Sequence, residues 1–435
     1  MVTEILCPAL FLVAPASGQG KTIITAAIAR YHRLQGREVR IFKMGPDYLD
    51  PQILEQASGH SVTQLDLWMA GDAYCREQFF EAAQTADLIL VEGAMGMYDG
   101  EPSSADLAVS FGIPMAIVMD VKAMAQTAAA LATGLANYRA DVEVLGLIAN
   151  HCASERHRQL IADALPAELP LLASFANNPE IRLPERHLGL VQATEISEEL
   201  EARFNAAAQC VSETVLARLP KAVPFYSQGL APPPQLLVGL KLGIAKDEAF
   251  SFIYPANIQL LEGMGAELHY FSPMRDMALP EVDALWLPGG YPELHAQALA
   301  DNSAMREQIQ AFFHAGQPIL AECGGFMYCL NKLRDLAGNS YSMLGLLAGD
   351  AVMRERGGCQ GMQTAILPAG EMRGHSHHRS LANVDLEPIA HGRRPKHSAP
   401  GEAIYCDKGL TASYIHLFFS SAPQVVAKIF TGNRV

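Results

Sequence analysis

The 435-residue sequence lacks any Cys-x-x-Cys pair, any surplus of basic residues and any long uninterrupted apolar run. Its eight scattered cysteines argue against a disulfide framework or a zinc site, and they favour a reducing, cytoplasmic compartment. A formal net charge of −14 does not provide the basic footprint of a general nucleic-acid binder. The longest apolar stretch, around 113–136, is interrupted by Asp120 and Lys122, so we expect no membrane span.

Half of the residues are hydrophobic, which provides enough material for a sizeable core. The length predicts two or three domains, and the proline-rich stretch between Leu219 and Gln235 has the composition of a stiff linker. We therefore expect one domain over residues 1–230 and a second over 236–435. Apolar strand-like runs alternate with helical patterns on both sides of the linker, which predicts an α/β fold with parallel sheets. The predicted strands are 9–14, 39–43, 86–91, 114–119, 144–149, 238–245, 267–271, 284–287, 319–321 and 412–418.

A phosphate-binding loop follows the first predicted strand. Pro15-Ala-Ser-Gly-Gln-Gly-Lys-Thr22 is a variant of G-x-x-x-x-G-K-[ST], with Pro15 where the first glycine usually stands. A strand precedes the loop and an Ala/Ile-rich helix follows it to about Leu34, so backbone N–H groups can surround a polyphosphate. We expect Lys21 to reach the outer phosphates and Thr22 to bind Mg²⁺. The residues predicted to bind ATP in this loop are Ser17, Gly18, Gly20, Lys21 and Thr22.

Acidic residues follow the next two strands. Asp47 and Asp50 lie after strand 39–43, and Glu92 and Asp99 lie after strand 86–91. The carboxyl ends of parallel strands are where open α/β sheets bind ligands, and Mg²⁺ prefers a few carboxylates together with phosphate oxygens. Asp47 and Glu92 are the candidate metal ligands. For each acid the alternative is a helix cap or a turn residue, and for Asp50 the two readings are about equal.

Three further polar residues are candidates for ligand contacts. Asn150 ends the strand 144–149, where it could read the edge of an adenine or serve as a loop residue. Arg186 and His187, in the segment Pro184–Gly189, have the cationic character that an anionic substrate needs, although a surface turn also explains them.

The segment Pro318-Ile-Leu-Ala-Glu-Cys-Gly-Gly-Phe326 predicts a strand, a tight turn and a helix, with Cys323 on the turn. Glycine takes the strained backbone angles of such a turn at low cost. A thiol at a helix N-terminus is expected to have a lowered pKa and a larger thiolate fraction. The alternative is a buried structural cysteine, but the flanking glycines favour a nucleophile.

A cysteine nucleophile needs an oxyanion hole and a base. Gly289 and Gly290 follow the strand 284–287 and, with Gly324, can provide backbone N–H groups for an oxyanion. His416, in the predicted strand 412–418, is the candidate base. A buried core histidine is the alternative. The cluster His375, His377 and His378 does not predict a metal site, because strand alternation would split it between two faces.

Together these motifs resemble those of the cobyrinic acid and hydrogenobyrinic acid a,c-diamide synthase family, over nearly the whole chain. The matching segments are Ala14–Thr22, Lys43–Pro51, Val91–Gly100, Asp247–Phe250, Pro288–Glu293 and Ala321–Phe326. The resemblance implies an N-terminal P-loop domain similar to dethiobiotin synthetase and a C-terminal class I-like glutamine amidotransferase domain. It also implies ATP, Mg²⁺, glutamine and a corrinoid carrying acetate side chains as ligands.

Carried over by position, the resemblance makes Cys323 the nucleophile and His416 its partner. It also implies that Asp47, Glu92 and Asp99 serve the site for ATP, Mg²⁺ and the corrinoid. The residues that we predict to contact the substrate are Tyr48, Asp50, Asp99, Arg186 and His187. The sequence departs from the family at two places. Phe418 stands where class I amidotransferases carry a carboxylate, and Gly374-His-Ser-His-His378 replaces Gly-His-Glu-Phe-His.

Two other classes of function remain open from the sequence. One is another glutamine-dependent tetrapyrrole amide ligase, such as a cobyric acid synthase or a nickel-sirohydrochlorin a,c-diamide synthase. The other is a P-loop nucleotide-binding protein without amidotransferase activity. A glutaminase assay separates the second from the first, and substrate assays separate the ligases from one another.

Overall fold

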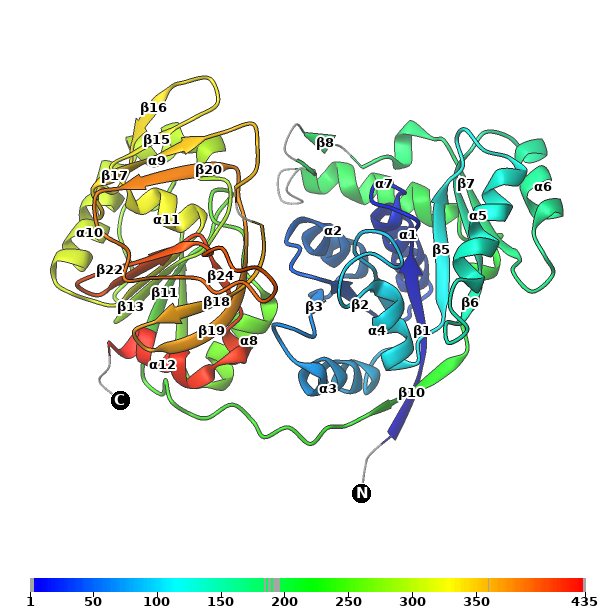
Figure 1. The fold of residues 1–435 in the computed structure, drawn as a ribbon, viewed down its shortest axis with the longest axis horizontal. Helices are drawn as coiled ribbons and strands as arrows, with labels where there is room; N and C mark the ends of the chain where they lie inside the picture. Colours follow the sequence, from blue (N-terminus) through cyan, green and yellow to red (C-terminus); the bar gives the residue numbers. More distant parts are fainter. Residues whose placement is uncertain (1–3, 184, 187–188, 191–195, 359, 433–435) are drawn as a thin grey trace. The chain divides into compact units, whose positions relative to one another are not determined.

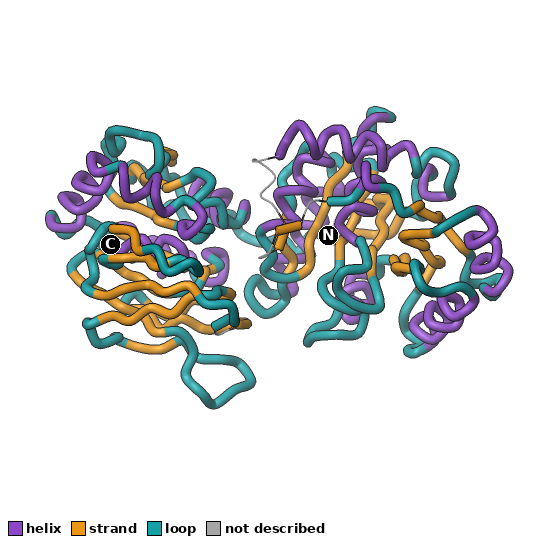
Figure 2. Tube along the Cα trace, turned by 90° about the horizontal axis from the view of Figure 1, so that it is seen from above, coloured by secondary structure: helices purple, strands orange, loops and turns teal. Residues whose placement is uncertain are grey.

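The computed structural model describes residues 4–183, 185–186, 189–190, 196–358 and 360–432. Contacts between Cα atoms divide the chain into two compact units. The first unit contains Met1–Leu67 and Gly71–Leu230, and the second contains Trp68–Ala70 and Ala231–Val435. In each unit the strands are gathered into sheets with helices around them (Figures 1 and 2).

The described residues of the first unit form an eight-stranded sheet with the order β3-β2-β4-β1-β5-β6-β7, and β10 pairs with β1. All the pairings are parallel except that of β1 with β10. The strands are β1 (Glu4–Val13), β2 (Val39–Met44), β3 (Thr63–Leu65), β4 (Leu88–Glu92), β5 (Met115–Asp120), β6 (Val144–Cys152), β7 (Leu171–Ala176) and β10 (Ala222–Tyr226). Because β2, β4 and β1 are neighbours, their carboxyl ends meet at one edge of the sheet.

One face of this sheet is covered by three helices whose apolar side chains share its core. Alternate residues of the strands, such as Leu10 and Leu12 of β1 and Leu88 and Leu90 of β4, point to this face. The covering helices are α1 (Lys21–Leu34), α2 (Leu49–Ser58) and α7 (Ser197–Gln209) (Figure 1). The other helices of the unit are α3 (Asp72–Ala83), α4 (Ser104–Phe111), α5 (Gln126–Asn137) and α6 (Glu155–Ala164), and a short hairpin consists of β8 (Glu185–Arg186) and β9 (Gly189–Leu190).

In the described part of the second unit, a seven-stranded sheet has the order β12-β11-β13-β14-β23-β22-β21. Its strands are β11 (Lys241–Ala245), β12 (Glu267–Phe271), β13 (Ala284–Leu287), β14 (Ile319–Glu322), β21 (Ala390–His391), β22 (Ala403–Asp407) and β23 (Leu410–Ser413). The helices are α8 (Pro255–Gly263), α9 (Ala296–Asp301), α10 (Ser303–His314), α11 (Gly324–Cys329) and α12 (Pro423–Thr431).

Two smaller sheets complete the second unit. The first has the order β18-β19-β24 and the second has the order β16-β15-β17-β20. Their strands are β15 (Lys332–Arg334), β16 (Ser340–Ser342), β17 (Gly349–Met353), β18 (Gln360–Leu367), β19 (Gly370–His377), β20 (Ser380–Val384) and β24 (His416–Leu417).

The apolar residues of β13 divide between two cores. Leu285 and Leu287 pack into one core, and Ala284 and Trp286 pack into the other. A strand that is apolar on both faces is typical of a parallel sheet covered by helices on both sides. This pattern explains why the sequence shows continuous apolar runs here.

The α/β fold with parallel sheets, predicted from the alternation of strands and helices, is confirmed in both units. The predicted strand 412–418 is wrong as a single strand, because β23 ends at Ser413 and β24 begins at His416 in another sheet. No helix among the described residues is both long and apolar enough to cross a membrane.

Candidate active sites

The loop between β1 and α1 depends on glycine at two positions with positive φ. Gly18 has φ +77° and Gly20, the N-cap of α1, has φ +91°. At Gly20 an added Cβ would also collide with the side-chain amide of Asn150. The loop therefore ends with its backbone at the N-terminus of α1, the geometry that binds phosphate groups.

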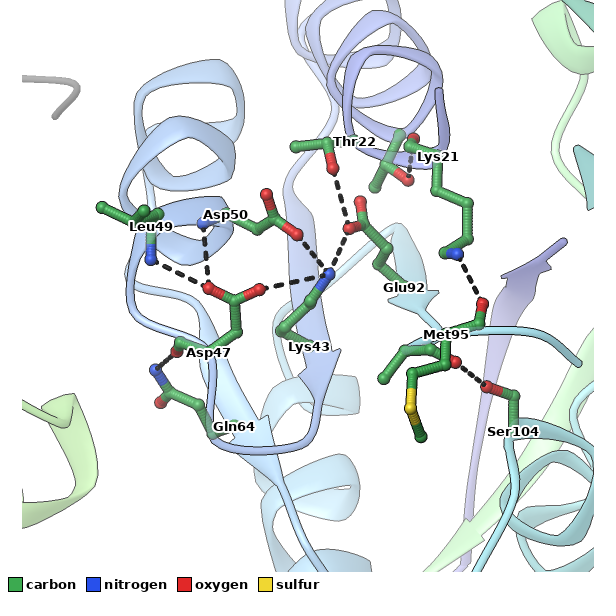
Figure 3. Close-up of polar contacts among 12 residues, drawn as sticks. Lys21, Thr22, Lys43, Asp47, Leu49, Asp50, Gln64, Glu92, Met95 and Ser104 are labelled. Atoms are coloured by element: carbon green, nitrogen blue, oxygen red, sulfur yellow. Dashed lines mark hydrogen bonds and ion pairs between the residues drawn. The ribbon is translucent and has the colours of Figure 1, made fainter. Parts of the chain in front are cut away.

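The side chains of Lys21 and Thr22 are held by the end of β4 and the loop that follows it (Figure 3). Lys21 Nζ donates to the carbonyl oxygen of Met95 at 2.8 Å, and Thr22 Oγ1 donates to Glu92 Oε1 at 3.1 Å. Burial lowers the pKa of Lys21, although Glu92 opposes the shift. Both side chains thus lie at the carboxyl end of β4, and their contacts with phosphate and Mg²⁺ stay predictions.

Lys43, at the end of β2, is the centre of a cluster that contains three of the predicted acids (Figure 3). Its Nζ lies 2.5 Å from Asp50 Oδ2, 2.5 Å from Glu92 Oε1 and 3.8 Å from Asp47 Oδ2. The Lys43 side chain is 5% exposed and that of Glu92 is fully buried. Lys43 is not among the residues predicted from the sequence, where the acids after the strand were the candidates, but its position at a strand end is a signal for it.

The buried charges of this cluster shift one another's pKa. Burial acts to lower the pKa of Lys43, but Asp50, Glu92 and Asp47 together raise it. Burial raises the pKa of Glu92, and Lys43 opposes that shift. At Asp50 the neighbouring Lys43 outweighs burial, so the pKa is lowered. The ammonium group therefore favours the charged form of each carboxylate, although burial still raises the pKa of Glu92 and raises that of Asp47 to about 7.

Glu92 also has the atom that best fits a metal ion. Its Oε2 is buried and has no hydrogen-bond partner within the part of the chain that the structure describes. Thr22 Oγ1 already contacts Oε1 of the same carboxylate. In the described residues no group of three or more His, Cys, Asp or Glu side chains could hold a metal by itself. A hydroxyl and one carboxylate fit Mg²⁺, which takes its other ligands from phosphates and water.

Asp47 supports the start of a helix, which was the alternative to a metal ligand in the sequence analysis. Its Oδ1 accepts from the backbone N–H groups of Leu49, at 2.9 Å, and Asp50, at 3.3 Å, so it supports the start of α2. Its Oδ2 faces Lys43. Gln64 donates to the Asp47 carbonyl oxygen at 3.1 Å, and Tyr48, the N-cap of α2, is buried. Metal binding by Asp47 stays a prediction.

The other candidate residues of the first unit are placed as follows. Asp99 Oδ2 accepts from the backbone N–H of Gly96 at 3.1 Å, in the loop after β4. Asn150 donates to the carbonyl oxygen of Gln19 at 3.0 Å and accepts from the backbone N–H of His151, so its amide supports the phosphate loop. Contact of Asn150 with adenine stays a prediction.

Arg186 and His187 were predicted to contact the substrate. Arg186 lies in β8, and His187 lies outside the described residues. Their contact with an anionic substrate stays a prediction.

We predict that Lys43→Met destabilises the first unit by about 3–5 kcal/mol, because it leaves three carboxylates facing one another without their cation. Lys122→Met, at an exposed lysine, is the control and should change the stability by less than about 0.5 kcal/mol. Thermal unfolding without nucleotide measures both. Without the ammonium group, the carboxylates of the folded variant bind protons more readily than those of the unfolded chain. The stability that Lys43→Met loses relative to the wild type should therefore become smaller as the pH falls. A deficit that is absent, or equal at every pH, would show that Lys43 does not neutralise the cluster.

In the second unit, Cys323 lies on a strained turn between β14 and α11. Its backbone has φ 45° and ψ −100°, and its N–H donates to the carbonyl oxygen of Ser413 at 2.8 Å. An added Cβ at Gly325 would overlap the backbone of Leu287. The sequence pattern Cys-Gly-Gly is therefore needed because the turn lies directly against the end of β13.

His416 and the predicted oxyanion residues are brought to the same place. The His416 ring lies against Gly289, where an added Cβ would collide with the imidazole. An added Cβ at Gly324 would lie 2.9 Å from the backbone nitrogen of Gly290. Gly289 and Gly290 therefore lie between the imidazole and the turn that carries Cys323.

The electrostatics of this site differ from the sequence prediction. Burial, and then the charges of Glu293 and Glu402, raise the pKa of Cys323, so the predicted lowering is wrong. The helix α11 has six residues and a short dipole, which does not offset burial. Burial and the neighbouring histidines, first of all His375, lower the pKa of His416 well below 6.5. These directions favour a neutral thiol at Cys323 and a neutral imidazole at His416.

The histidine segment of β19 supports His416. The ring of His375 stacks on that of His416 with centroids 5.4 Å apart and an interplanar angle of 22°. Tyr254 Oη lies 3.3 Å from His375 Nδ1, and burial lowers the pKa of His375 to about 3. The ring of Phe418 packs edge-on against Tyr254, so position 418 belongs to the apolar wall of the site.

His378 lies in a neighbouring polar group. Its Nε2 is 2.9 Å from Glu402 Oε1, and its ring stacks flat on Tyr414 with centroids 3.7 Å apart. Ser380 Oγ donates to Tyr414 Oη at 2.8 Å. The segment 375–378 therefore contacts both Tyr414 and His416.

Two families of known protein domains match this chain, one in each of its halves. Residues 10–191 match a nucleotide-binding domain described as CobQ/CobB/MinD/ParA, and residues 241–424 match a CobB/CobQ-like glutamine amidotransferase domain. A nucleotide-binding unit and a glutamine amidotransferase unit in one chain define a glutamine-dependent amide ligase.

Curated relatives match over nearly full length. A hydrogenobyrinate a,c-diamide synthase of Stutzerimonas stutzeri is 48% identical over 97% of this chain and 98% of its own. One of Pseudomonas aeruginosa is 48% identical over 100% of this chain and 99% of its own. A cobyrinate a,c-diamide synthase of Herminiimonas arsenicoxydans is 43% identical over 96% of this chain and 95% of its own. The chain belongs to the hydrogenobyrinate and cobyrinate a,c-diamide synthase family.

We predict that the glutaminase kcat/KM of the enzyme stays on its plateau to below pH 6.5, because a base with a lowered pKa is still neutral there. His416→Ala should lower glutamine-driven turnover by a factor of about 10² or more and leave turnover with ammonia near normal. His391→Ala, at an exposed histidine of β21, is the control. A wild-type rate and pH profile in His416→Ala would make this histidine structural.

Proposed function

We propose that the protein amidates the a and c acetate side chains of hydrogenobyrinate or cobyrinate, with ATP as the energy source and glutamine as the nitrogen donor. The observation that carries the proposal is the presence in one chain of two chemistries. One is a thiol–imidazole site framed by glycines, and the other is a phosphate loop beside a buried carboxylate cluster. Relatives with these substrates in their names match along the whole chain.

We assign glutamine hydrolysis to residues 236–435. The proton of the Cys323 thiol passes to His416 as the sulfur attacks the carboxamide carbon of glutamine. Backbone N–H groups of Gly290 and Gly324 stabilise the oxyanion. His416 returns the proton to the departing nitrogen, which leaves as ammonia. Water then hydrolyses the thioester to glutamate and restores the thiol.

We assign amide formation to residues 1–230. The γ-phosphoryl group of ATP passes to an acetate carboxylate of the macrocycle, and ADP leaves. Ammonia attacks the carbonyl carbon of this acyl phosphate, and phosphate leaves as the amide forms. Lys21 and the N-terminus of α1 hold the phosphates. Mg²⁺, held by Thr22 and Glu92, would offset the negative charge that the phosphates bring.

The relatives favour a metal-free macrocycle. The two relatives at 48% identity carry the hydrogenobyrinate name, and the one at 43% carries the cobyrinate name. We therefore propose hydrogenobyrinate as the preferred substrate.

We predict that Cys323→Ala and Lys21→Ala separate the two half-reactions. Cys323→Ala should abolish glutamine-driven amidation and keep ammonia-driven amidation, because ammonia bypasses the thiol. Lys21→Ala should abolish both, because neither nitrogen donor reacts with an unactivated carboxylate. Product formation with each donor measures the effect. Glutaminase activity in Cys323→Ala, or normal ammonia-driven turnover in Lys21→Ala, would refute the corresponding assignment.

We also predict that the enzyme, given ATP, Mg²⁺ and glutamine, converts hydrogenobyrinate to a diamide with a higher kcat/KM than cobyrinate. Mass spectrometry of the products measures both additions, and nickel-sirohydrochlorin and the diamide itself are the comparison substrates. Turnover of nickel-sirohydrochlorin in preference to both corrinoids would contradict the proposed substrate.

A further inference from the structure

A carboxyl group that neither site accounts for is buried directly before the nucleophile. Glu322, the last residue of β14, is 2% exposed. Its Oε1 accepts from the backbone N–H of Leu417 at 2.8 Å, and its Oε2 accepts from Trp286 Nε1 at 3.0 Å. A glutamate is almost never fully buried unless it is paired, and here both of its oxygens have N–H donors.

The two bonds of Glu322 connect three strands. Trp286 lies on β13, which neighbours β14 in the main sheet, and Leu417 lies on β24 in the three-stranded sheet. The N–H of Leu417 belongs to the peptide group whose carbonyl is that of His416. A bond to this N–H therefore fixes the backbone of His416 relative to the strand that carries Cys323.

The strand β24 has only two residues, so its position depends on a few contacts. On one side it pairs with β19, where Leu417 stands opposite Gly374 and His416 opposite His375. Asn257 donates to the Leu417 carbonyl oxygen at 2.9 Å. Glu322 provides the acceptor for the remaining group of this residue, its buried N–H.

We infer that Glu322 is a positioning residue that holds His416 in place for proton transfer with Cys323. The inference rests on the proposed roles of these two residues. A carboxyl is suited to the task because two N–H donors need two acceptor oxygens, and a glutamine would turn an NH₂ group towards one of them. Phe418 stands where a carboxyl could contact the His416 imidazole. Glu322, on the strand that carries Cys323, instead bonds the backbone next to His416.

The test uses the full-length enzyme and glutaminase kinetics. Glu322→Gln should lower kcat at least about tenfold, because a small displacement of a catalytic base is costly. The KM for glutamine should change by less than about twofold, since the residue does not contact the substrate. Turnover with ammonia should remain at the wild-type level, which shows that the first unit is intact.

Trp286→Phe supplies the second measurement. By itself it removes one donor and leaves the bond to Leu417, so kcat should stay within about threefold of the wild type. In the double variant Trp286→Phe/Glu322→Gln, the NH₂ group can face the side from which the donor was removed, and the amide oxygen accepts from Leu417. The double variant should therefore have a higher kcat than Glu322→Gln alone. If Glu322→Gln fails to fold, the double variant should fold, and its kcat is then compared with that of Trp286→Phe.

Three results would overturn the inference. One is a wild-type kcat in Glu322→Gln, and a second is a rise in KM with kcat unchanged. The third is a double variant no better than Glu322→Gln, which would mean that the bonds to Trp286 and Leu417 do not matter. The kcat and KM of each variant are compared with those of the wild type. The proposed function is tested separately, by glutaminase activity in the wild type and its loss in Cys323→Ala.

Discussion

The close approach of backbones around Cys323 is the constraint on which the second unit depends. An added Cβ at Gly290 would fall on the backbone of Ala249, and at Gly325 it would fall on that of Leu287. No side chain fits at these main-chain contacts, so the turn carrying Cys323 packs directly against the end of β13, and the residues after β13 pack against those after β11. The imidazole of His416 then rests against Gly289, and its place follows from the same crowding.

Burial disfavours charge at both sites, but the neighbouring groups differ. Around Cys323 and His416, nearby carboxylates and histidines add to the effect of burial, so neutral forms are favoured. Around Lys43, three carboxylates outweigh burial and raise the pKa of the ammonium group. Each unit has its own apolar core, so these environments can differ within one chain.

The sequence predicted what depends on local pattern. The phosphate loop and the Cys-Gly-Gly turn follow from short-range geometry, and the structure has both between a strand and a helix, as predicted. Apart from the strand 412–418, the predicted strands end within three residues of the observed ones, and the largest difference is at β6, which continues through Asn150 to Cys152. The sequence-based predictions were wrong where contacts between distant segments determine the structure or a pKa. The pKa of Cys323 depends on Glu293 and Glu402, which no local pattern brings together. The break between Ser413 and His416 arises because β19 pairs with the end of an apolar run that reads as continuous. The sequence shows only that Glu322 precedes Cys323, because its hydrogen-bond partners lie on two other strands.

The charge count at the phosphate loop has a consequence for the form in which a nucleotide arrives. Lys21 and Lys43 provide two ammonium groups, and Asp47, Asp50 and Glu92 provide three carboxylates, so the formal charge of the group is −1. Burial raises the pKa of Asp47 to about 7, so this charge is reached above that pH, where a bare polyphosphate would meet like charge. A divalent counter-ion would offset part of the phosphate charge, so the metal complex of a nucleotide would meet less repulsion here than the bare nucleotide.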